Sequence, residues 1–252
     1  FDRHLVGMAS TYPAAESGYV TDSAAAATAL GSGKKTYNGA IGVDTNKQAV
    51  MSVLTWAKQQ KKKTGVVVTS QVNHATPAAY LTHNESRKNY NQIADSYIND
   101  GAKVDLLLGG GWQYFIRPDR NLIDEFKQAG FHYLDHYNQL DSLPKKQPIL
   151  GLFAQVGLPW ALDDINPYRL TTMTQAANDY LANPQGYFLL IEASQIDWAG
   201  HNNDIAAAMA EMDDLAKLLE YLEGYVAQHK DTLVILTADH STGGFTLGAK
   251  GK

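Results

Sequence analysis

A serine preceded by an aspartate begins an alanine-rich stretch near the start of the chain, in the run VTDSAAAAT at positions 20–28. We expect Ser23 to open a helix that Gly31 and Gly33 close, because glycine is common just past helix ends. An isolated Asp-Ser pair before a helix is most often only an N-cap. The same geometry would also place the Ser23 hydroxyl among free backbone N–H groups, where a phosphate group is stabilised.

Two later segments combine carboxylates with histidines. Glu192 ends a strand-like run, where a buried carboxylate is costly unless something compensates its charge. Asp197 and His201 are four residues apart, so one helical turn would put both on one face, and Asp239 and His240 are adjacent. Taken alone, the first pair is more often a surface ion pair and the second more often a turn. Carboxylate and imidazole together also suit a zinc ion.

The fourth group is the run QVNHATP at positions 71–77, followed by SRK at positions 86–88. Thr76 offers a hydroxyl oxygen to a hard cation, and Arg87 is a candidate for bidentate phosphate binding. A turn followed by a basic helix start would explain this segment by itself. The four groups together supply a nucleophile, carboxylates, histidines and an arginine, which is a complete set for phosphoryl transfer.

The elements that must position these groups alternate along the chain. Short apolar runs predict buried strands at 65–69, 104–108, 187–191 and 232–237. Helical periodicity predicts helices at 47–60, 92–99, 122–129, 170–182 and 204–226. This alternation indicates an α/β fold with a doubly wound, mostly parallel sheet sandwiched between helices. Ligands of such sheets bind beyond the carboxyl ends of the strands, where the polar groups lie.

Length and composition limit the remaining possibilities. The 252 residues, 44% hydrophobic and 19% charged, fit a single catalytic domain over 1–252, with 135–168 a possible insertion or active-site rim. The net charge of −5 argues against a nucleic-acid-binding surface, and no apolar run is long enough to span a membrane. The absence of cysteine excludes disulfides. Because the chain opens on Phe1 without a signal peptide, we expect further sequence at both ends.

These motifs resemble the alkaline phosphatase family. VTDSAAAAT resembles the family's active-site signature, and the Glu-x4-Asp-x3-His spacing of residues 192–201 resembles its ligand run. The runs TADH at 237–240 and HATP at 74–77 also match, and the similarity extends over nearly the whole chain. His74 and Trp198 together resemble certain marine and cold-adapted bacterial members.

The resemblance implies a phosphomonoester hydrolase that uses two zinc ions and one magnesium ion. Ser23 would be the phosphorylated nucleophile and Arg87 would bind the phosphate. The implied ligands are Asp197 and His201 for the first zinc, Asp239 and His240 for the second, and Glu192 and Thr76 for magnesium. Asp22, His74 and Trp198 are expected to lie next to these residues and to support them without binding the metal ions or the phosphate directly.

The resemblance also implies small phosphomonoesters and inorganic phosphate as ligands, a homodimer for the full-length protein, and a periplasmic or secreted location. The family has an aspartate ligand before the nucleophile and a histidine ligand well after residue 240, and we assign neither role to a residue of this chain. A related metal-dependent phosphodiesterase or sulfatase is the alternative enzyme, although those families usually have Thr or a modified Cys as nucleophile. An inactive phosphate- or metal-binding form is the non-enzymatic alternative.

Overall fold

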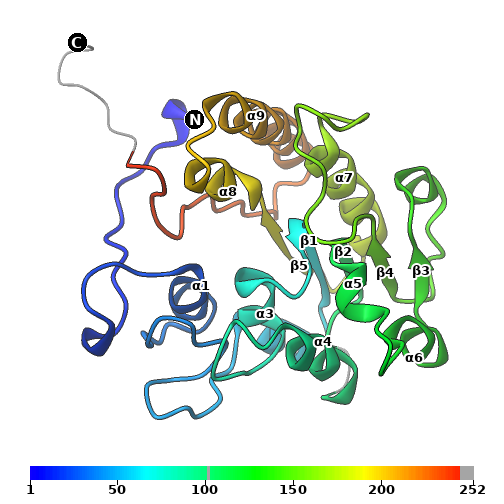
Figure 1. Cartoon of the computed structure of the whole chain (residues 1–252). Coiled ribbons are helices and arrows are strands. Elements are labelled where there is room, and N and C mark those ends of the chain that lie inside the picture. Colours follow the sequence, from blue (N-terminus) through cyan, green and yellow to red (C-terminus); the bar gives the residue numbers. More distant parts are fainter. Residues whose placement is uncertain (101–102, 245–252) are drawn as a thin grey trace.

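The computed structural model describes residues 1–100 and 103–244, and its centre is a five-stranded sheet (Figure 1). The strand order is β3-β4-β2-β1-β5, and every neighbouring pair is parallel. The strands are β1 (Lys63–Gln71), β2 (Leu106–Gly110), β3 (His132–Leu134), β4 (Ile149–Leu152) and β5 (Tyr187–Glu192). Because the strands are parallel, their carboxyl ends lie at one edge of the sheet.

Helices cover both faces of this sheet (Figure 1). One face packs under α1 (Ser23–Ser32), α2 (Val53–Gln59), α3 (Ala75–Leu81), α4 (Tyr90–Asn99), α5 (Trp112–Phe115) and α6 (Leu122–Gln128). The other face is covered by α7 (Arg169–Leu181) and α9 (Ile205–Gln228), with α8 (Gln195–His201) beside them. Successive side chains of a strand point to opposite faces, so Val66 and Val68 join the first core while Val67 joins the second. The predicted α/β/α architecture is confirmed.

The alanine-rich helix α1 is buried because its side chains are small. Ala24 and Ala27 have no exposed surface, and Gly31 lies against the ring of Tyr80 on α3, where an added Cβ would be 3.3 Å from ring carbons. Gly33 follows the helix with φ of 73°, the left-handed conformation in which glycine ends helices without strain. The predicted start at Ser23 and the predicted end at Gly33 are therefore confirmed, whereas Gly31 lies inside the helix.

The sequence located most elements but made one clear error. Three of the predicted strands coincide with β1, β2 and β5, whereas residues 232–237 form no strand in the described structure. Their side chains are exposed, with Leu233 82% and Ile235 78% accessible. A strand is stabilised by ladder hydrogen bonds to a neighbour, and this segment makes none with the other described residues.

Two strands and three short helices had no sequence signal of their own. β3 and β4 are three and four residues long, and α3, α5 and α8 are seven, four and seven residues long. Strand β4 falls inside the segment 135–168 that we expected to be an insertion or a rim, and it pairs with both β2 and β3. The helix predicted at 47–60 begins only at Val53, after the side chain of Ser52 caps it.

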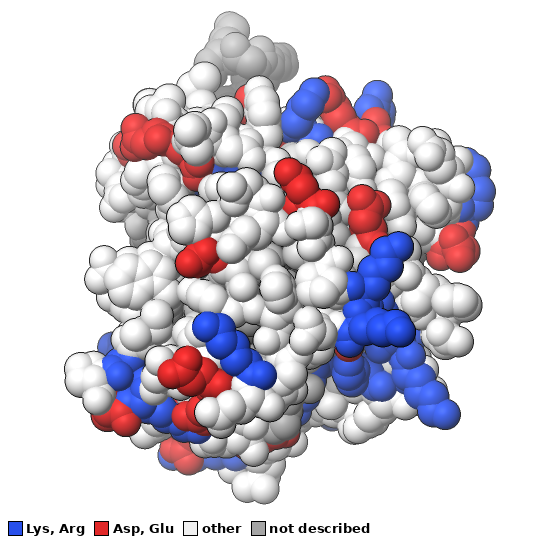
Figure 2. All heavy atoms as spheres, turned by 90° about the vertical axis from the view of Figure 1, so that its right-hand side faces the viewer, with Lys and Arg blue, Asp and Glu red and all other residues white. Residues whose placement is uncertain are grey.

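The surface adds two general observations. Figure 2 shows the side of the molecule toward which β3 and α6 lie, where basic side chains gather in one area and acidic ones are scattered over the rest. No helix within residues 1–100 and 103–244 has both the length and the apolar character that crossing a membrane requires.

An aromatic cluster stabilises the first core, and its removal should be costly. Phe126 on α6 is 1% exposed, and its ring centroid lies 6.0 Å from that of Phe115 and 4.9 Å from that of Phe131. We expect Phe126→Ala to reduce the free energy of unfolding by about 3–5 kcal/mol, because the substitution leaves a cavity and removes the contacts with the rings of Phe115 and Phe131. Urea titration would measure this. Leu162→Ala, at a 63% exposed position, is the matched control, and an equal loss in both variants would contradict the expectation.

Candidate phosphate and metal site

Ser23 is the first residue of α1 and lies at the edge of the sheet where the strands end. It is 7% exposed, and its Oγ is 3.0 Å from Nε2 of His240, which is more than two hundred residues later in the chain. The preceding residue, Asp22, is the N-cap, and its Oδ1 accepts a hydrogen bond of 2.9 Å from the backbone N–H of Ala25. The capping function therefore belongs to Asp22, and the Ser23 hydroxyl is not used to cap the helix.

Arg87 lies on the other side of the same helix start. Its Nη1 is 3.0 Å from Oδ2 of Asp22, and its Nη2 is 3.3 Å from Nε2 of His74. His74 is the N-cap of α3, and burial together with the neighbouring Arg87 charge lowers its pKa to about 4. A neutral imidazole can accept a hydrogen bond from the guanidinium. Asp22 and His74 therefore orient Arg87, and an aromatic contact of 5.7 Å between His74 and Trp198 extends this support to α8.

The two Asp-His pairs are connected to each other through Asp197 and His240. Asp197 and His201 are one turn apart on α8, with His201 Nε2 3.5 Å from Asp197 Oδ1. His240 Nδ1 is 4.0 Å from the same Asp197 oxygen, and its Nε2 is 3.3 Å from Asp239 Oδ2. Pairwise contacts of 3.3 to 4.0 Å thus connect these four potential ligands, two carboxylates and two imidazoles, and His240 also contacts Ser23.

Glu192 and Thr76 form the third part of the site. Glu192 is the last residue of β5, and its Oε2 accepts hydrogen bonds from the hydroxyls of Ser194 (2.6 Å) and Ser70 (3.5 Å). Burial, together with the nearby charges of Asp239 and Asp197, raises the pKa of this carboxyl group to about 7, although the hydroxyls of Ser194 and Thr76 act in the opposite direction. The Thr76 Oγ1 is buried and meets no partner at full hydrogen-bond geometry in the described residues.

The side chains described above provide donor atoms that suit metal ions, but they do not form closed coordination sites. Within the described residues, no three His, Asp or Glu side chains already surround one point as a closed metal cluster would. The mixed oxygen and nitrogen donors of the two Asp-His pairs suit zinc. The oxygen donors Glu192 and Thr76 suit magnesium, and the unsatisfied buried hydroxyl of Thr76 is the kind of atom that a bound cation would satisfy.

All eleven residues that the sequence singled out thus lie around one edge of the sheet. Sequence reasoning missed Thr242, whose hydroxyl donates to Asp197 Oδ1 and lies 3.1 Å from His240 Nδ1. It also missed Ser194 and Ser70 beside Glu192. Isolated hydroxyl residues in turns carry no pattern, so only their position in space identifies them.

Comparison with known proteins agrees with this geometry. The sequence profile of the alkaline phosphatase family matches residues 1–252, the whole chain. The chain belongs to the alkaline phosphatase family.

Individual relatives give the degree of similarity. Alkaline phosphatase 4 of Bacillus subtilis (strain 168) is 54% identical over the whole chain, and alkaline phosphatase of Escherichia coli (strain K12) is 32% identical over 88% of it. The chain covers 56% and 58% of these two proteins, so it spans little more than half the length of these relatives.

Two solved alkaline phosphatases share the fold. A cold-active enzyme from a psychrophilic Shewanella species is 54% identical, with a TM-score of 0.93 over the whole chain and 62% of that structure. The enzyme from the Antarctic bacterium TAB5 is 34% identical, with a TM-score of 0.89 over 97% of this chain and 72% of that structure. A TAB5 variant in which a histidine is replaced by aspartate has been solved with Mg bound in the M3 site.

Proposed function

We propose that this chain carries most of the active site of a phosphomonoester hydrolase that works through a phosphoserine formed on Ser23. The observation that carries the proposal is the position of the Ser23 hydroxyl. It lies at the amino end of a ten-residue helix, 3.0 Å from His240 and next to Asp22, which pairs with Arg87. A nucleophile, a helix dipole and a guanidinium thus converge where a phosphoryl group would bind.

Metal ions complete the proposal. We assign Asp197 and His201 to one zinc and Asp239 and His240 to a second, and we assign Glu192 and Thr76 to magnesium. When bound, zinc would supply positive charge that lowers the pKa of the Ser23 hydroxyl and stabilises the departing oxygen. The magnesium in the TAB5 variant supports the presence of a magnesium site in this chain's family.

The reaction then needs little covalent chemistry from other residues. The Ser23 hydroxyl gives its proton to water and its oxygen attacks phosphorus, a bond forms between Oγ and phosphorus, and the bond to the alcohol oxygen breaks, after which that oxygen takes up a proton from water. The guanidinium of Arg87 and the backbone N–H groups at the start of α1 neutralise the remaining phosphoryl oxygens. Water then cleaves the phosphoserine, which restores Ser23 and releases inorganic phosphate.

We further propose small phosphomonoesters as substrates. The groups at the site are suited to binding the phosphoryl oxygens and recognise little of the alcohol group. Homodimerisation and a periplasmic or secreted location of the full-length protein are implied by the family resemblance. The single catalytic domain over residues 1–252 is likewise a proposal.

Hydrolysis of p-nitrophenyl phosphate against pH, measured on the full-length protein with and without added zinc and magnesium, tests the proposed function. We expect metal-dependent turnover that rises toward alkaline pH. If the metal-loaded protein hydrolyses only bis-p-nitrophenyl phosphate or a sulfate ester, the diesterase or sulfatase alternative replaces it. Phosphate binding without any turnover would indicate a non-catalytic protein.

A further inference from the structure

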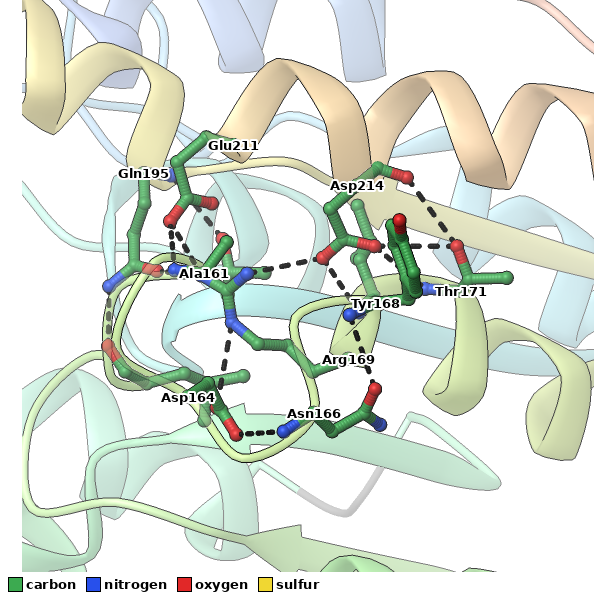
Figure 3. A network of polar contacts seen from close by, with 12 residues as sticks. Ala161, Asp164, Asn166, Tyr168, Arg169, Thr171, Gln195, Glu211 and Asp214 are labelled. Carbon is green, nitrogen blue, oxygen red and sulfur yellow. Dashed lines mark hydrogen bonds and ion pairs between the residues drawn. The ribbon is translucent and has the colours of Figure 1, made fainter. Parts of the chain in front are cut away.

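Arg169 is a fully buried arginine that belongs to none of the groups described above. It is the first residue of α7, has no exposed surface, and extends into the space between α7, α8 and α9 (Figure 3). An arginine in this position must have its charge compensated and its donors satisfied, because an unpaired buried charge is very costly.

Three buried carboxylates surround the guanidinium. Its Nη2 donates to Glu211 Oε1 at 2.7 Å, its Nη1 lies 3.2 Å from Asp214 Oδ2, and its Nε lies 3.8 Å from Asp164 Oδ2. Asp214 on α9 also accepts from the backbone N–H groups of Leu170 and Thr171 at the start of α7. The network therefore fixes α7 against α9.

The same arginine also contacts α8. Its Nη2 donates to the side-chain carbonyl oxygen of Gln195, the first residue of α8 (Figure 3). The Gln195 side-chain amide donates to the carbonyl oxygen of Leu158, and its backbone N–H donates to Thr69 Oγ1 at 3.3 Å. Gln195 is 2% exposed, and its side-chain oxygen and nitrogen and its backbone N–H each have a partner.

Helix α8 has no side-chain cap of its own and is positioned by tertiary contacts, which also include packing against α9 and the burial of Ala199 and Gly200. It is seven residues long, and the side chain of its N-cap, Ser194, bonds to Glu192 instead of to the helix. A short helix without a local cap depends on tertiary contacts for its position. Beside Leu158, a Cβ added to Gly157 would lie 2.4 Å from the ring of Trp198 and 3.3 Å from the side-chain nitrogen of Gln195, so this part of the chain packs directly against α8.

We propose that Arg169 and Gln195 are positioning residues that set the orientation of α8 and thereby the placement of its two ligands, Asp197 and His201. Asp197 is two residues after Gln195, so a rotation of α8 about its axis would move the carboxylate relative to His240. This inference rests on the proposed function, because it assigns Asp197 and His201 to zinc.

The test is zinc affinity of the full-length protein, measured by competition with a chromogenic chelator. Gln195→Met preserves the length of the side chain and leaves Arg169 paired with Glu211 and Asp214. We expect a loss of zinc affinity of about 10–100-fold, the usual effect of removing a residue that orients a metal ligand. Thr171→Val is the matched control, because Thr171 contacts Asp214 in the same network but not Gln195, and its zinc affinity should stay within about threefold of wild type.

A double-mutant cycle tests whether Arg169 acts through Gln195. Arg169→Lys keeps the positive charge but not the planar geometry, and it should weaken zinc binding as well. The combined variant should lose little more affinity than Gln195→Met alone, whereas additive losses would overturn the role of Arg169.

Asp197→Ala separates failure of this inference from failure of the proposed function. If Asp197→Ala binds zinc as tightly as wild type, the zinc assignment itself is wrong. If Asp197→Ala loses zinc while Gln195→Met retains wild-type affinity, the zinc assignment stands and the positioning role is overturned. Loss of affinity in Gln195→Met and Thr171→Val alike would also overturn it, since that would indicate general destabilisation.

Discussion

Replacing Ser23 with alanine should abolish turnover of phosphomonoesters while the full-length protein keeps its metals. The variant lacks the only protein atom in the proposal that forms a bond to phosphorus, so we expect kcat to fall by at least about 10⁴-fold. Helix α1 should remain intact, because Asp22 and not Ser23 supplies the N-cap bond. Steady-state hydrolysis of p-nitrophenyl phosphate and metal content measured on the same samples would check both expectations.

Ser32→Ala is the matched control for this experiment. Ser32 ends the same helix, and its hydroxyl bonds to the carbonyl oxygen of Thr28 at 2.6 Å, away from the site. The control variant should keep wild-type turnover. Unchanged turnover in Ser23→Ala would refute the phosphoserine mechanism, and a loss of metal in that variant would show that the residue has a structural role.

Replacing Arg87 with alanine should weaken binding of inorganic phosphate by about 10–100-fold, because one charge-assisted bidentate contact is lost. Arg87→Lys should recover only part of this affinity, since an ammonium group cannot donate two parallel hydrogen bonds to one phosphate. The inhibition constant of phosphate against p-nitrophenyl phosphate hydrolysis measures both variants. Asp22 and His74 hold the guanidinium of Arg87 in place. In Arg87→Ala, both residues lose this partner.

Lys88→Ala is the control for charge alone, because Lys88 is the exposed neighbour of Arg87 in the sequence. Phosphate inhibition should change little in this variant. An equal effect of Lys88→Ala and Arg87→Ala would mean that overall positive charge, and not a contact made by Arg87, determines phosphate affinity.

The part of the sheet that the sequence predicted is the part with strong local patterns. The runs in β1, β2 and β5 are continuous and apolar because both faces of these strands are covered, or nearly so, by helices. Residues 232–237 have the same composition and yet are exposed and unpaired in the described structure. The apolar composition of a segment indicates that it could be buried. To form a strand, the segment also needs a neighbouring strand with which to exchange hydrogen bonds.

The sequence by itself determined the chemistry of this protein: which side chains could attack, bind phosphate or ligate metals, and that these follow strands or begin helices. Those properties depend on residue type and short spacing, which are local. Only the tertiary structure decided that Ser23 meets His240, that Asp22 and His74 orient Arg87, and that Arg169 connects α7, α9 and α8. Such contacts join residues far apart in the chain, and they exist because parallel strands bring their carboxyl ends to one edge of the sheet and helices pack across it.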